Sequence, residues 1–116
     1  MSKIRDIFIK IGEGIKNNPQ DVLKIKGVYL FRISGDDGGV FHIDLKDNPG
    51  VSFEEKPADC SLFVRDKDFI KIVKGVLPGF KAMLTGKLKV EGNLQLASKL
   101  NDVFTMARQE RKIQDQ

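Results

Sequence analysis

The sequence predicts a single α+β domain: one β-sheet of five short strands with helices packed on one of its faces. Two observations predict this class. Five β-branched, aromatic or alternating segments are separated by turns rich in Gly, Pro and Asp. Segments with apolar residues three and four apart lie before, between and after them. With 116 residues, the chain suits one domain. We assign residues 1–105 to it and residues 106–116 to a charged C-terminal helix end or tail.

The first half of the chain predicts a helix followed by four strands. Residues 3–16 carry an apolar stripe at helical spacing, and a further helical turn is expected after Pro19. A hairpin follows, in which two alternating segments flank the turn GDDGG. The stripe and the four expected strands are Ile4, Ile7, Phe8, Ile11 and Ile15, then VYLFRIS, VFHIDLK, VSFEE and CSLFV.

In the second half, the period of the apolar residues changes to that of a helix. We expect Asp66 or Asp68 to cap this helix and Gly75 to end it. Residues 76–86 form a Pro/Gly-broken apolar segment with one helical turn, followed by the strand KLKVEG. Asn93 is expected to cap a last helix. The apolar residues of that helix are Leu94, Ala97, Leu100, Val103 and Phe104.

The net charge of +4 is unevenly placed. Residues 1–65 hold ten Lys/Arg and ten Asp/Glu, so all of the excess falls on residues 66–116. Residues 69–90 contain five lysines and no acid. This segment is either an ordinary solvated surface or a contact for an anionic membrane. Nucleic acid is disfavoured, because Phe69 and Phe80, its candidate stacking residues, are at positions expected to face the apolar interior.

Several classes of protein are disfavoured by what the sequence contains. No apolar run approaches the roughly 20 residues that cross a bilayer, and the charged N-terminus does not suit a signal peptide. The single Cys60 cannot form an internal disulfide, which fits a reducing compartment such as the cytoplasm. His42 and Asp44 alternate on one strand, and we expect a surface histidine beside a carboxylate rather than a base for Cys60, itself expected to be a small buried residue. We therefore expect no enzyme.

No cofactor or metal site is expected either. One histidine and one cysteine cannot supply a tetrahedral zinc shell. GFKAMLTGK has six residues between its glycines and lacks the Ser or Thr of a phosphate loop. The surplus of apolar residues over 69–84 is the informative feature, because one narrow helix face needs fewer. These residues either fill a dry core or line a cavity for an apolar ligand.

Two quoted segments carry a family resemblance. ADCSLFVRDKDFIKIVKG followed by AMLTGKLKVEGNLQLASKL resembles the sterol carrier protein-2 (SCP-2, non-specific lipid-transfer) domain, notably in the Gly-Lys-Leu-Lys-x-x-Gly-Asn unit. The resemblance implies a five-stranded, mostly antiparallel sheet with an apolar tunnel beneath its helices. It implies an apolar lining, for which the positions of matching character are Phe8, Ile11, Ile15, Phe69, Ile70, Val73, Leu77, Phe80, Met83, Leu84, Leu100 and Phe104.

The same resemblance implies a non-enzymatic lipid carrier that takes fatty acids, fatty acyl-CoA, sterols or phospholipids, as a monomer or weak dimer. Four lysines are candidate contacts for a membrane or a lipid headgroup: Lys71, Lys74, Lys81 and Lys87. The resemblance also allows a peroxisomal location, but the chain ends Gln-Asp-Gln rather than in a Ser-Lys-Leu-type tripeptide, so this route to the peroxisome is not expected. The alternative function is an adaptor of the same fold, with a closed core and a protein partner.

Overall fold

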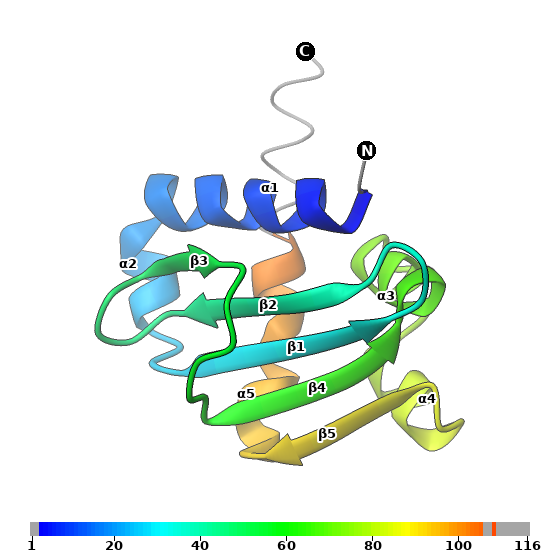
Figure 1. Cartoon of the computed structure of the whole chain (residues 1–116). Helices are drawn as coiled ribbons and strands as arrows, with labels where there is room; N and C mark the ends of the chain where they lie inside the picture. Colours follow the sequence, from blue (N-terminus) through cyan, green and yellow to red (C-terminus); the bar gives the residue numbers. More distant parts are fainter. Residues whose placement is uncertain (1–2, 106–107, 109–116) are drawn as a thin grey trace.

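The computed structural model describes residues 3–105 and 108 (Figure 1). Five helices and five strands are present in this part of the chain, and residues 100–105 are helical as well. The tail predicted for 106–116 lies outside the described residues, except for Arg108. In chain order the elements are α1 Lys3–Asn17, α2 Pro19–Leu23, β1 Val28–Ser34, β2 Gly39–Asp44, β3 Gly50–Ser52, β4 Cys60–Arg65, α3 Asp66–Val73, α4 Gly79–Leu84, β5 Leu88–Gly92 and α5 Leu94–Ser98.

The five strands form one sheet in the order β3-β2-β1-β4-β5. Three neighbouring pairs are antiparallel, and the central pair of β1 and β4 is parallel. The turn Gly35–Gly38 joins β1 to β2 as a hairpin, as its Gly/Asp composition predicts. The predicted α+β class and mostly antiparallel sheet are confirmed.

The helices lie over one face of the sheet, and the core fills the space between them (Figure 1). Alternate residues of β1 point toward the helices, so Tyr29, Phe31 and Ile33 all belong to this core. Phe8 of α1 stacks on Phe41 of β2, with ring centroids 4.3 Å apart. Such aromatic packing buries large apolar surfaces and fixes the position of α1 over the sheet.

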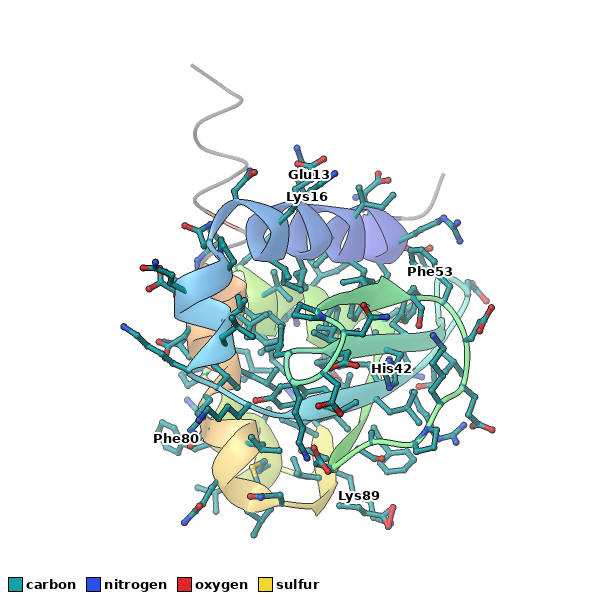
Figure 2. The ribbon with its side chains drawn as sticks, turned by 90° about the vertical axis from the view of Figure 1, so that its left-hand side faces the viewer. Glu13, Lys16, His42, Phe53, Phe80 and Lys89 are labelled. Atoms are coloured by element: carbon teal, nitrogen blue, oxygen red, sulfur yellow. The ribbon has the colours of Figure 1, made fainter. Side chains whose placement is uncertain are left out.

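The opposite face of the sheet is crossed by the connection from β3 to β4, which places His42 in the interior. Because β4 lies beyond β1 in the strand order, residues 53–59 must pass over β2 and β1 to reach it (Figure 1). Pro57 O lies 3.0 Å from His42 Nε2, and the His42 side chain is 5% exposed. Figure 2 shows His42 beneath this connection. The prediction of a surface histidine is wrong, because a long-range crossing covers it.

Helix capping follows the sequence at α5 but not at α3. Asn93 Oδ1 accepts hydrogen bonds from the backbone N–H groups of Gln95 and Leu96, at 3.0 and 3.3 Å, as predicted. The N-cap of α3 is Arg65, which makes no side-chain cap bond. Neither predicted aspartate occupies that position, because the strand conformation continues to Arg65. Asp66 is buried in the first turn of α3.

The carboxylate of Asp66 instead connects α3 to the β1–β2 turn. Its Oδ2 accepts a hydrogen bond from the N–H of Asp37 at 3.1 Å. Asp37 in turn accepts from the N–H groups of Lys3 and Ile4, at 3.0 and 3.2 Å. These donors are at the start of α1, where the first N–H groups have no partner within the helix. The GDDGG turn therefore anchors the starts of two helices.

Candidate functional site

An apolar cavity of about 590 Å³ lies between the sheet and the helices at the β4–β5 side. Its volume falls within the roughly 300–1,000 Å³ typical of small-molecule sites. The lining comes from β1, β4, β5, α3, α4, α5 and the segments that join and follow them. It consists of Phe31, Leu62, Val64, Phe69, Ile72, Gly75, Leu77, Pro78, Gly79, Phe80, Met83, Leu88, Leu94, Ala97, Ser98, Leu100, Asn101 and Phe104.

The floor of the cavity is the helix-facing side of the sheet. Leu62 and Val64 alternate along β4, and Phe31 pairs with Leu62 on the neighbouring strand. On the other side of Leu62, Val90 of β5 pairs with it. Because strand residues two apart share a face, this floor is continuous and apolar.

The wall formed by α5 is fixed to the sheet by Tyr29. The Tyr29 hydroxyl donates a buried hydrogen bond of 2.6 Å to the backbone oxygen of Leu96. Burial raises the pKa of Tyr29, and the nearby Cys60 and Asp102 raise it further, so the hydroxyl stays protonated and able to donate. Gly27 lets the wall approach closely, because a Cβ atom there would lie 2.5 Å from Leu96 Cδ2.

The cover of the cavity is the short and interrupted segment 75–86. Gly75 has a φ of +81°, which turns the chain out of α3. The N–H groups of Val76 and Leu77 then bond to the Lys71 oxygen, at 3.0 and 3.1 Å. The α4 helix that follows has six residues and one fully buried side chain, Ala82. This cover is held by less buried apolar surface than the helices over the centre of the sheet.

Among residues 3–105 and 108, no ionisable side chain lines the cavity, and the polar side chains that do so belong to Ser98 and Asn101. Within residues 3–105 and 108, no group of three or more His, Cys, Asp or Glu side chains is placed to hold a metal ion. In that same part of the chain, no helix has both the length and the apolar character to cross a bilayer. The cavity can therefore exclude water from a ligand but offers little directional chemistry.

The only histidine and the only cysteine do not meet. Cys60 pairs with Tyr29, and His42 pairs with Leu30. Since Tyr29 and Leu30 are adjacent on β1, their side chains and those of their partners point to opposite faces of the sheet. Cys60 is buried, as predicted. Burial raises the pKa of the Cys60 thiol, and the neighbouring Asp59 adds to this, so the thiolate is disfavoured.

The predicted lining residues divide into three groups. Half of them line the cavity: Phe69, Leu77, Phe80, Met83, Leu100 and Phe104. Five are packed in or against the core away from it: Phe8, Ile11 and Ile15 on α1, and Ile70 and Val73 on α3. Phe8 and Ile15 also border a second hollow of about 490 Å³ between α1 and β3. Leu84 is 81% exposed and lines neither hollow.

The sequence prediction omitted the sheet side of the cavity. Phe31, Leu62 and Val64 form its floor, and their period-two alternation is the signal that could have identified them. Leu88 and Ile72 also line the cavity. Phe80 is 70% exposed although it was expected to face the interior. Phe80 nevertheless lines the cavity, so it lies where the cavity opens to solvent.

All four predicted headgroup-contact lysines are exposed, and they lie on or beside the cover. Lys71 and Lys74 are at the end of α3, Lys81 is on α4, and Lys87 precedes β5. These lysines place positive charge on the segments that cover the cavity, whose described lining residues carry none.

Comparison with known proteins assigns the family. The model of the SCP-2 sterol transfer family matches residues 8–105 of the chain. The chain belongs to this family. A relative, hydroxysteroid dehydrogenase-like protein 2 of Pongo abelii, is 42% identical over 88 residues, which are 72% of this chain and 21% of the relative. The chain thus spans about a fifth of that relative's length.

Solved structures agree with this SCP-2 assignment. Sterol carrier protein 2 from Yarrowia lipolytica, in its apo form, superposes with a TM-score of 0.77 at 26% identity, covering 87% of this chain and 88% of that one. Sterol carrier protein-2 from Aedes aegypti, solved in complex with palmitate, gives a TM-score of 0.71 at 26% identity, covering 86% and 92%. The SCP-2 fold predicted from the sequence is confirmed, and the apolar tunnel that the resemblance implies stays a prediction.

Proposed function

We propose that this SCP-2 chain is a non-enzymatic lipid carrier that holds the hydrocarbon part of a fatty acid, fatty acyl-CoA, sterol or phospholipid in the cavity at β4–β5. The observation that carries the proposal is the cavity of about 590 Å³, whose described lining residues include no ionisable side chain. Palmitate in the complex of the Aedes aegypti relative is an example of such a ligand. A closed-core adaptor is disfavoured by the same cavity.

The hydrophobic effect alone accounts for useful affinity. Burying a methylene group contributes about 0.8 kcal/mol, so about fifteen methylenes contribute roughly 12 kcal/mol. Association costs at least about 4 kcal/mol in lost translational and rotational freedom, which leaves up to about 8 kcal/mol. This corresponds to a dissociation constant near micromolar. Because no directional contact is needed, the same cavity accepts several lipid classes.

The charge distribution favours one orientation of the ligand. A carboxylate or phosphate buried among apolar side chains without a partner is strongly destabilised. The tail therefore occupies the cavity, and the polar end stays at the mouth beside the exposed lysines of the cover, with Lys74 and Lys81 the first candidates.

The test uses a substitution that fills the cavity. Ala97 lines it from α5, and Ala97→Trp places a large side chain in the space a tail would occupy. We expect the dissociation constant for a fluorescent fatty acid to rise at least tenfold. Lys99→Trp is the matched control, because Lys99 is exposed on the same segment and does not line the cavity. It should bind like the wild type.

Lipid extraction and mass spectrometry of the purified protein complete the test. Stoichiometric lipid in the wild type, and its loss in Ala97→Trp, would support the carrier. If the wild type neither retains lipid nor binds the fluorescent fatty acid, the carrier proposal is wrong and the adaptor becomes the better explanation.

A further inference from the structure

The exposed apolar side chains of the molecule gather on the cover of the cavity. Among the described residues, five of the eight exposed large apolar side chains fall between positions 76 and 94. We call three of them the crest: Val76, Phe80 and Leu84, which are 71%, 70% and 81% exposed. The exposed apolar residues elsewhere, Ile9 and Leu23 among them, are less than half exposed. Apolar surface concentrated in this way marks an interaction site.

The crest projects from one side of the protein. Phe80 and Leu84 are four residues apart on α4, so they lie on the same face of that helix. The buried Ala82 anchors the opposite face. The α4 helix lies at the edge of the molecule remote from α1 (Figure 1), and Figure 2 places Phe80 at the molecular surface. The crest is therefore free to enter an apolar phase without disturbing the core.

The positive charges around the crest indicate what kind of partner it binds. Residues 69–90 contain five lysines and no acid, and the flanking acids along the chain are Asp68 and Glu91. Lys74, Lys81 and Lys87 are exposed next to the three crest residues. Apolar side chains surrounded by lysines match the two layers of an anionic bilayer, an apolar interior under negatively charged headgroups.

We infer that the crest and its lysines form a docking surface for an anionic phospholipid bilayer, with Val76, Phe80 and Leu84 entering the acyl region and the lysines contacting headgroups. Phe80 also lines the mouth of the cavity, so docking sets that mouth against the membrane. The inference deepens the proposed function by naming the surface through which a lipid would be exchanged. The inference rests on the proposed function only for the biological role of docking, since the contact with the bilayer itself requires no lipid in the cavity.

The decisive variant separates docking from lipid binding. Val76 and Leu84 do not line the cavity, so Val76→Gln with Leu84→Gln removes crest surface and leaves the lining intact. We expect this double variant to partition about tenfold more weakly onto phosphatidylcholine vesicles containing about 30% phosphatidylserine, because each side chain loses its apolar transfer. Its affinity for a fluorescent fatty acid should equal that of the wild type. Vesicle co-sedimentation measures the first quantity and fluorescence the second.

Two control variants locate the effect. Ile9→Gln with Leu23→Gln removes a similar number of exposed apolar side chains from α1 and α2 and should bind vesicles like the wild type. The three crest lysines changed to Glu should weaken binding at least 100-fold, since each lysine near an anionic surface contributes about fivefold. Changing Lys16, Lys24 and Lys46 to Glu alters the net charge by the same amount at exposed positions away from the crest. This variant should lose much less vesicle binding.

Three results would overturn the inference. The first is that the wild type does not co-sediment with these vesicles, which would favour a protein partner for the crest. The second is that the crest double variant binds the vesicles as well as the wild type. The third is that the α1–α2 control loses as much vesicle binding as the crest variant. Failure of the carrier is distinguishable from all three, because the wild type would then bind vesicles yet bind no fatty acid.

Discussion

Replacing Tyr29 by Phe tests how the α5 wall of the cavity is held. The substitution removes the hydroxyl that donates 2.6 Å to the Leu96 oxygen and keeps the ring in the core. That oxygen also accepts a bond of 3.1 Å from the Lys99 N–H, so it is not left without a partner. The free energy of unfolding should therefore fall by about 1 kcal/mol, the net contribution of one hydrogen bond. A buried polar group left without a partner would cost roughly 3 kcal/mol instead.

Urea unfolding followed by far-UV circular dichroism measures this difference in free energy. In a thermal scan, about 1 kcal/mol corresponds to a fall in Tm of about 4–8 °C. Tyr29→Leu is the comparison variant, since it also removes ring volume from the core and should cost 2 kcal/mol or more, by analogy with roughly 3–5 kcal/mol for complete aromatic truncation. If Tyr29→Phe is as stable as the wild type, the hydroxyl does not hold α5 and the reasoning fails.

Two further predictions concern titration and capping. Burial raises the pKa of Tyr29 above its ordinary value of about 10, so its contribution to stability is complete below pH 10 and declines as the pH rises beyond it. Because the chain has one tyrosine and no tryptophan, tyrosinate absorbance should stay low above pH 10 until the protein unfolds; normal titration would contradict this. Asp37→Ala removes the acceptor for the first N–H groups of α1 and should destabilise the fold by about 1 kcal/mol in urea, whereas the exposed neighbour Asp36→Ala should have little effect.

The order of elements could be predicted because local chemistry specifies it. Alternation defines β1 and β2, Pro19 begins α2, Gly75 follows α3, and Asn93 caps α5. The failures concern tertiary relations. His42 is buried by a connection that must cross two strands, and Asp66 bonds a turn 29 residues earlier. Neither contact has a signature in the neighbouring sequence.

The cavity was predicted more completely on its helical side than on its sheet side. The apolar surplus between Phe69 and Leu84 identified the cover, because it exceeded what one helix face can bury. The strands gave no comparable surplus, since Leu62 and Val64 would be equally expected in a filled core. Which apolar residue contacts protein and which contacts a hollow depends on how two layers are spaced, and periodicity does not determine that spacing.

The exposure of Leu84 also depends on tertiary structure, namely on how the cover of the cavity is built. Segment 75–86 has too few residues between Gly75 and β5 for a long helix that would bury every apolar side chain. Ala82 anchors α4, so residues on its other side must face outward. Polar residues at Val76 and Leu84 would leave the core filled, because both side chains are mostly exposed. Apolar side chains at these positions lower solubility in water, and the proposed bilayer contact would offset this cost, which makes the vesicle experiment the sharpest test of this face.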